Sequence, residues 1–244
     1  MPDERAETEE CAGAHGAVNI VAKGWFWGLD YLYVSYWQVR EAVFRADPAR
    51  YADPHAAKPP ILLLPGIFET WQFLRPLADQ LSESGHPVHV VTGLGRNSRT
   101  VAASSPIVEN YLREHDLRDV TIVAHSKGGL IGKYVMAKGD REGRISRMVA
   151  IATPFSGSAY ARYVLVRSLR DFSPRDATTL MLGELRSLNE RITSIYGIFD
   201  PHIPGGSALP GATNVRLDVA GHFRILGDRR LRDAVARAVD QPAP

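Results

Sequence analysis

The fold is decided by one stretch, Val120-Thr121-Ile122-Val123-Ala124-His125-Ser126-Lys127-Gly128-Gly129-Leu130. It begins as a short strand of β-branched residues, passes through a serine between small residues, and then enters a helix. A serine on a sharp strand-to-helix turn needs small neighbours, because its backbone is strained and the flanking residues pack closely. Ala124 and Gly128 meet this requirement. We therefore interpret Ser126 as a catalytic nucleophile, although a serine that merely caps the helix would give the same pattern.

The same turn predicts two backbone donors for a negatively charged oxygen. The N–H of Lys127 lies at the start of the helix, which favours negative charge beside Ser126. A second donor is expected in the loop after the apolar strand 61–64, whose sequence is Pro65-Gly66-Ile67. Pro65 has no N–H and Gly66 allows a close approach, so we choose the N–H of Ile67. The alternative is a plain turn that ends the strand.

Strand and helix patterns alternate along most of the chain. Strands are expected near residues 61–64, 87–92, 119–124, 146–152, 193–198 and 214–219, and helices near 75–84, 106–116, 127–138 and 224–239. This order predicts an α/β fold with a mostly parallel central sheet and helices on both faces. Active sites in such sheets lie at the carboxyl ends of the strands.

A serine nucleophile needs a neutral imidazole to remove its proton and an anion to orient that imidazole. Asp200 and His222 each follow a predicted strand, as this arrangement requires. Asp200 precedes a proline and could be only a turn residue, and His222 could be only a loop histidine. Asp218 is the rival acid, but it lies within its strand.

Two other histidines are less suitable as the base. His125 adjoins Ser126 in sequence and would project elsewhere, and His202 follows the strand of the acid too soon.

Composition limits the classes of protein. With 244 residues, 45% hydrophobic and 23% charged, the chain predicts one globular domain. A net charge of +2 without a long basic run argues against nucleic-acid binding. Cys11 is the only cysteine, and apart from His202 near Asp200 no cluster has metal-ligand spacing, so neither a metal nor another cofactor is expected. The acidic N-terminus has no signal-peptide pattern, which favours a cytoplasmic protein, with membrane association as an alternative.

Three segments follow from these patterns. They are an acidic, disordered tail at 1–17, an aromatic-rich helix and connector at 18–58, and the α/β domain at 59–244. Residues 18–45 hold three of the four tryptophans, with Lys23, Asp30 and Glu41 forming a narrow polar stripe on a helix. The wide apolar face either packs on the domain or makes a peripheral membrane contact, and Asp30 argues against a spanning helix.

Residues 155–191 interrupt the alternation and are interpreted as a helical, lid-like insertion over the site. Its inner surface is expected to be apolar, formed by Val164, Leu165, Leu169, Leu180, Met181, Leu182 and Leu185. Ordinary packing of these helices on the sheet is the alternative.

Several motifs together resemble the α/β-hydrolase superfamily, and within it the bacterial lipases and esterases of the triacylglycerol lipase type. The motifs are Leu64-Pro65-Gly66-Ile67, Ala124-His125-Ser126-Lys127-Gly128-Gly129, Ala152-Thr153-Pro154-Phe155-Ser156-Gly157-Ser158, Leu185-Arg186-Ser187-Leu188-Asn189, Asp200 and Gly221-His222. The resemblance covers about residues 59–240. It implies a triad of Ser126, Asp200 and His222, an oxyanion hole from the Ile67 and Lys127 amides, and ester hydrolysis without a cofactor.

Two positions differ from these lipases. Pro65 stands where a histidine is usual, which leaves open what supports the oxyanion loop. Lys127 carries a charge where an uncharged residue is usual. Its ammonium group is expected either to favour anionic substrates or to lie in solvent.

The sequence therefore predicts a carboxylic-ester hydrolase that forms an acyl-enzyme and acts on a small-molecule ester or lipid. The apolar insertion favours a lipid-like acyl chain. An acyltransferase or thioesterase could use the same triad, and a non-catalytic lipid-binding or membrane-associated protein could use the same scaffold. Neither the oligomeric state nor the acyl-chain length is encoded in a recognisable pattern.

Overall fold

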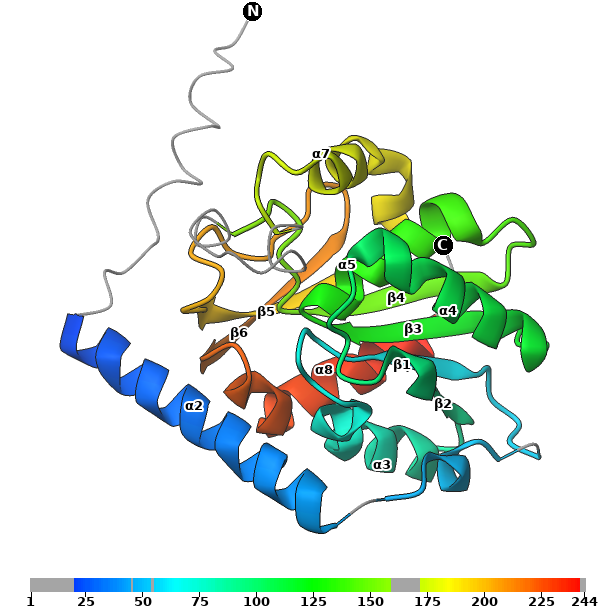
Figure 1. Cartoon of the computed structure of the whole chain (residues 1–244), viewed down its shortest axis with the longest axis horizontal. Coiled ribbons are helices and arrows are strands. Elements are labelled where there is room, and N and C mark those ends of the chain that lie inside the picture. Colours follow the sequence, from blue (N-terminus) through cyan, green and yellow to red (C-terminus); the bar gives the residue numbers. More distant parts are fainter. Residues whose placement is uncertain (1–19, 45, 54, 159–171, 242–244) are drawn as a thin grey trace, which may run out of the picture.

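One parallel sheet of six strands organises the molecule (Figure 1). The computed structural model describes residues 20–44, 46–53, 55–158 and 172–241, so the tail predicted at 1–17 lies outside the described residues. The strand order is β2-β1-β3-β4-β5-β6, and every neighbouring pair is parallel. The strands are β1 (Ile61–Leu64), β2 (Val88–Val90), β3 (Val120–His125), β4 (Ile145–Ile151), β5 (Ile192–Phe199) and β6 (Thr213–Ala220). The predicted α/β architecture is confirmed.

Helices cover both faces of this sheet. On one face lie α2 (Ile20–Val43), α3 (Arg75–Glu83) and α8 (Arg229–Asp240), and on the other α4 (Val101–Glu114), α5 (Lys127–Tyr134) and α7 (Ala177–Glu184). The short helical turns are η1 (Pro48–Tyr51), η2 (Trp71–Leu74), η3 (Thr92–Leu94), η4 (Val135–Gly139), η6 (Arg186–Arg191) and η7 (Arg224–Gly227).

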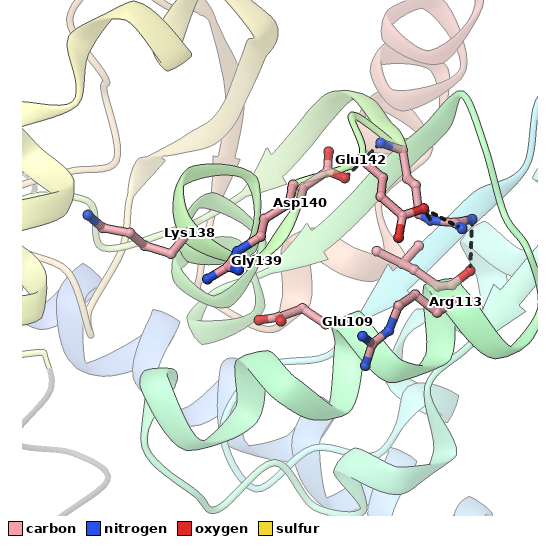
Figure 2. A pocket seen from close by; sticks show the side chains of 9 residues that line it. Glu109, Arg113, Lys138, Gly139, Asp140 and Glu142 are labelled. Atoms are coloured by element: carbon pink, nitrogen blue, oxygen red, sulfur yellow. Dashed lines mark hydrogen bonds and ion pairs between the residues drawn. The ribbon is translucent and has the colours of Figure 1, made fainter.

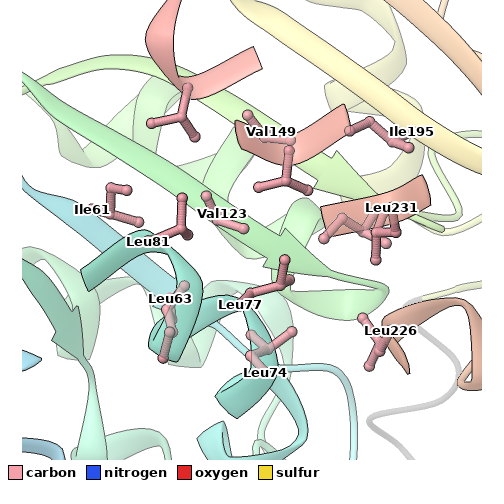
Figure 3. Close-up of a cluster of buried hydrophobic side chains, with 14 of the residues drawn as sticks. Ile61, Leu63, Leu74, Leu77, Leu81, Val123, Val149, Ile195, Leu226 and Leu231 are labelled. Carbon is pink, nitrogen blue, oxygen red and sulfur yellow. The ribbon is translucent and has the colours of Figure 1, made fainter. Parts of the chain in front are cut away.

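The alternation of side chains along the strands divides the core into two clusters. Ile61, Leu63 and Val123 point into the cluster beneath α3 and α8, which Figure 3 shows. Their neighbours Leu62 and Ile122 point into the cluster beneath α4 and α5. Successive residues of a strand face opposite sides, so strands covered on both faces are apolar throughout. This explains the continuous apolar runs in the sequence.

Helix α4 begins earlier than the sequence predicts. It was expected at 106–116, but Thr100 caps it, with its side-chain oxygen accepting from the N–H of Ala103 at 3.2 Å. Pro106 lies inside the helix. Proline usually marks a helix start because it has no N–H, but here Pro106 and Ala102, four residues before it, lie on the exposed side.

The described part of the insertion packs on the sheet. Leu182 of α7 is buried in the second cluster, and Met181 and Leu185 pack against it. Leu180 is exposed, so its predicted place on the inner apolar surface is wrong, because it lies on the opposite side of α7. Val164, Leu165 and Leu169 lie outside the described residues.

Helix α2 and the connector pack against the first cluster. Trp37 of α2 and Tyr51 of η1 are buried there, with Tyr33 and Val34 beside them. The predicted polar stripe is wrong at Asp30, whose side chain is fully buried. In the described part of the chain, no helix has the length and hydropathy needed to cross a bilayer.

Candidate active site

Ser126 occupies a sharp turn between β3 and α5. Its φ of 50° lies in the left-handed region, which is strained for a residue with a side chain. Its N–H donates to the carbonyl of Ile151 at 2.8 Å, which ties the turn to β4. A Cβ at Gly128 would collide with the carbonyl oxygen of Leu64, and one at Gly129 with the side chain of Thr153. The small residues after the serine are therefore required by close packing.

His222 and Asp200 complete a hydrogen-bonded chain with this serine. His222 Nε2 lies 2.9 Å from Ser126 Oγ, and His222 Nδ1 lies 2.7 Å from Asp200 Oδ2. A carboxylate can only accept, so Nδ1–H donates to Asp200, and Nε2 is left to accept the proton of the serine hydroxyl. Asp200 Oδ1 also accepts the N–H groups of His202 and Ile203, at 2.8 and 3.1 Å. The structure thus brings together Ser126, Asp200 and His222, the three side chains that the sequence predicts to act together.

The alternative acid and bases have other positions or partners. Asp218 is exposed within β6. His125 is fully buried, with Nδ1 2.8 Å from Glu69 Oε1 and Nε2 3.1 Å from the carbonyl oxygen of His222. His202 packs its ring 5.0 Å from the ring of His222, and burial lowers the pKa of His202 to about 4. It is therefore neutral near pH 7.

Electrostatics prepare His222 for accepting a proton. Burial alone would lower the pKa of His222, but the Asp200 carboxylate, aided by Glu69 and Asp30, raises that pKa above its ordinary value. Burial would likewise raise the pKa of Asp200, yet the facing His222 holds that pKa below its ordinary value. Asp200 therefore stays ionised, and His222 gains affinity for the proton it would take from serine.

The loop after β1 lies beside Ser126, because β1 and β3 are parallel neighbours whose carboxyl ends lie together. The strand order also reverses here, since β2 lies on one side of β1 and β3 on the other. Glu69 accepts the N–H of Gly66 at 2.7 Å, and the side chain of Asn97 donates to the carbonyl of Pro65, also at 2.7 Å. A Cβ on Gly66 would lie 2.6 Å from Glu69 Oε1. Because Pro65 replaces the usual histidine, the sequence left open what supports this loop. The contacts of Glu69 and Asn97 supply that support, and they hold the loop that carries Ile67.

The side chain of Lys127 does not face solvent. It is fully buried, and its ammonium group donates to the carbonyl of Asn97 at 2.8 Å and to the carbonyl of Arg99. The expectation that this group lies in solvent is wrong, because the side chain runs toward the loop after η3. An effect on anionic substrates stays a prediction. The backbone N–H of Lys127 remains at the start of α5, as predicted.

Two acidic residues near the site have no sequence motif. Glu69 links the loop after β1 to His125, and Asp30 of α2 accepts backbone N–H groups around His222. Asp30 is the only charged residue between positions 24 and 39, in an otherwise apolar and aromatic segment. This isolation was the only sign in the sequence that Asp30 has a specific role. A carboxylate buried in an apolar helix face needs hydrogen-bond donors from elsewhere in the fold. Glu69 offered no comparable signal.

One group among the described residues has ligand atoms close enough to hold a metal ion. These are Asp200, His202 and His222, whose atoms lie within 4.8 Å of one another. The donor set suits an ion such as zinc. However, Asp200 and His222 already share the 2.7 Å hydrogen bond. A metal ion bound there would break this bond and the link from Asp200 through His222 to Ser126.

A separate pocket lies at the amino ends of the strands, just before β4 and opposite the end that holds Ser126 (Figure 2). Its volume is about 210 Å³, and its lining includes Glu109, Lys138, Glu142 and Arg144. Arg144 pairs with Glu142 at 2.7 Å and with Asp116 at 2.9 Å. These charges stabilise the start of the strand and lie far from Ser126.

The class of protein follows from the fold, the sheet order and a sequence match. The model of the alpha/beta hydrolase fold family matches residues 59–179. The chain has the α/β-hydrolase fold. No curated protein sequence matches the chain.

Solved structures share this fold at low sequence identity. A lipase from Bacillus licheniformis, in its mature form, is 20% identical with a TM-score of 0.58, over 79% of this chain and 96% of that chain. An enol-lactonase from Burkholderia xenovorans is 16% identical with a TM-score of 0.54, over 78% and 94%. A structure from a study of carboxylesterases of Nitrososphaera gargenis is 15% identical with a TM-score of 0.53, over 76% and 91%. These neighbours show the shared fold.

Proposed function

We propose that this protein is a serine hydrolase that cleaves carboxylic esters, with Ser126, His222 and Asp200 as its catalytic triad. The observation that carries the proposal is the hydrogen-bonded chain from Asp200 through His222 to Ser126, with the serine on a strained turn. Such a chain activates a hydroxyl that is otherwise a poor nucleophile.

The mechanism follows from the positions of these groups. His222 Nε2 takes the proton of Ser126 as Oγ attacks the ester carbonyl, and Asp200 stabilises the imidazolium that forms. The amides of Ile67 and Lys127 are the proposed donors to the oxygen of the tetrahedral intermediate. The alcohol leaves with the proton from His222, and water then attacks the acyl-enzyme through the same base.

Aromatic side chains beside the triad support a substrate with an apolar portion. Trp27 and Tyr31 of α2 stack on each other, and Trp27 lies 5.1 Å from the ring of His202. His202 in turn contacts His222. Apolar esters of lipid-like character fit such surroundings better than small polar esters.

The exposed face of α2 supports a peripheral contact with a membrane surface. Trp25, Leu32, Tyr36, Val39 and Val43 are all more than half exposed. Tryptophan and tyrosine are favoured at the interface between lipid and water, and a helix lying in that plane buries such a face. This contact would bring the site near lipid esters.

The proposal is tested by hydrolysis of p-nitrophenyl esters of increasing acyl length. We expect Ser126→Ala to reduce kcat/KM by roughly 10³-fold or more. The control Ser156→Ala changes an exposed serine in the loop after β4, and its kcat/KM should stay within about twofold. The acyl length that gives the highest kcat/KM distinguishes an esterase from a lipase.

Other outcomes would favour the alternatives. Turnover that depends on Ser126 but appears only when an acceptor alcohol or a thioester is supplied indicates an acyltransferase or thioesterase. Wild-type protein that neither hydrolyses any ester nor reacts with a fluorophosphonate at Ser126 contradicts the proposed function and leaves the non-catalytic, lipid-binding interpretation.

A further inference from the structure

Asp30 stands out because it is a buried carboxylate in a helix outside the family match. It lies in α2, whereas the match begins at residue 59. Its side chain is fully buried, at 0% exposure. Burying an ionised carboxylate is costly unless its oxygens accept several hydrogen bonds, so its partners should explain its position.

Those partners are three consecutive backbone N–H groups around His222. Asp30 Oδ2 accepts from the N–H of His222 at 3.0 Å. Asp30 Oδ1 accepts from the N–H groups of Phe223 and Arg224, each at 2.8 Å. Hydrogen bonds to a charged acceptor are stronger than neutral ones, so this single side chain holds the segment where β6 passes into η7.

The backbone of this segment is shaped to receive the carboxylate. Gly221 has a φ of 112°, a conformation that strongly favours glycine. A Cβ at Gly221 would lie 2.8 Å from Asp30 Oδ1. The residue before His222 therefore leaves space for Asp30 as well as making the turn.

The peptide groups of His222 are held from two sides. Asp30 accepts its N–H, and His125, itself paired with Glu69, lies 3.1 Å from its carbonyl oxygen. A carbonyl only accepts, so His125 Nε2–H is the donor. With its N–H and C=O groups both fixed, the histidine presents Nε2 to Ser126 in one orientation.

We propose that Asp30 is a positioning residue for the catalytic base, so that α2 is part of the active site. The proposal rests on the proposed function. Asp30 does not contact the reacting atoms and acts through the backbone of residues 222–224. Because a displacement of about 1 Å in a catalytic group can reduce a rate roughly 100-fold, the three hydrogen bonds have a direct effect on catalysis.

Asp30→Asn tests this role with little change in shape. An amide has one oxygen in place of two, so its NH₂ group must face at least one of the three donors. We expect kcat per active site to fall roughly 100-fold, with KM changed by less than about threefold. Sites are counted by complete labelling of Ser126 with a fluorophosphonate. The matched control Asp218→Asn removes the same charge at an exposed position four residues before His222.

The pH dependence of kcat/KM separates positioning from a purely structural role. The charged and titratable groups around His222 are Asp200, Asp30, Glu69, His125 and His202. Removing the Asp30 charge should move the acid limb to lower pH, because that charge helps to raise the pKa of His222. Asp30→Glu keeps the charge but displaces the oxygens, so it should lower kcat without moving the limb. A lower Tm with wild-type kcat per site and a wild-type limb overturns the proposal.

Amide exchange in the wild-type protein provides a test that does not require a folded variant. If Asp30 holds residues 222–224, NMR should find their amides exchanging as slowly as those of the sheet. Exchange as fast as in exposed loops overturns the proposal. This measurement needs no substrate, so failure of ester hydrolysis in the wild type would count against the proposed function and not against the role of Asp30.

Discussion

Lys127 shows how a single residue can have a backbone role and a separate side-chain role. Its N–H belongs to the turn at Ser126, whereas its ammonium group stabilises the carbonyls of Asn97 and Arg99. Asn97 in turn holds Pro65. The side chain therefore connects the start of α5 to the loop after η3 and, through it, to the loop after β1.

Replacing Lys127 by methionine should reduce stability and leave substrate charge preference unchanged. Methionine fills similar space but leaves the two carbonyls without this donor, which we expect to lower the free energy of unfolding by about 1–3 kcal/mol. Denaturant unfolding measures this loss, and the exposed Lys138→Met is the control. A large change in the kcat/KM ratio between neutral and anionic esters, at wild-type stability, would contradict this assignment.

The residues that were predicted from sequence are those governed by local constraints. Ser126 is marked by its small neighbours, and Asp200 and His222 by their position just after strands. Asp30 and Glu69 are joined to the site by contacts 192 and 56 residues apart in sequence, to His222 and His125 respectively. No local pattern encodes such pairings, so these residues became visible only in the folded chain.

Helix α2 exposes apolar side chains on the face opposite its buried one. One face buries Asp30 and Trp37, while the opposite face exposes Trp25, Leu32 and Val39. An amphipathic pattern would have predicted polar residues on the exposed face. The aromatic and aliphatic residues there are the feature that the proposed membrane contact would explain.

Flotation with lipid vesicles tests that contact without disturbing the buried face. The triple variant Trp25→Ser, Leu32→Ser and Val39→Ser should partition roughly 10-fold or more less than the wild type, because it loses apolar area that the interface would bury. Leu180→Ser, which changes an exposed leucine on α7, should partition like the wild type. Equal flotation of the triple variant and the wild type would refute the contact.

Other elements differ in how completely their sequences define them. Strands β1, β2 and β3 are buried throughout, and all six strands were predicted within one or two residues. The start of α4 was not, since Thr100 as a cap was less conspicuous than Pro106. Helix α7 could not be assigned to a face from sequence, because packing against α5 decides which side is buried.

For the molecule as a whole, the central question is whether the α/β part can fold without the segment before it. The sequence divides the chain at about residue 59, where the family match also begins. Yet Trp37 and Tyr51 lie in the same buried cluster as Ile61, Val123 and Leu231. One hydrophobic core thus spans the boundary, and a parallel sheet of this kind requires covering on both faces.

We therefore expect a chain lacking residues 1–45 to be severely destabilised or unable to fold. It would lose Trp37, Tyr33 and Val34 from the core and the Asp30 carboxylate from residues 222–224. Removing one buried aromatic costs about 3–5 kcal/mol, which is a large part of the roughly 5–15 kcal/mol that stabilises a typical protein. Thermal unfolding followed by circular dichroism measures the loss, with Trp37→Ala as the single-residue comparison. A truncated chain that unfolds cooperatively near the wild-type Tm would show that the segment is dispensable, and the role of α2 would then be confined to the surface.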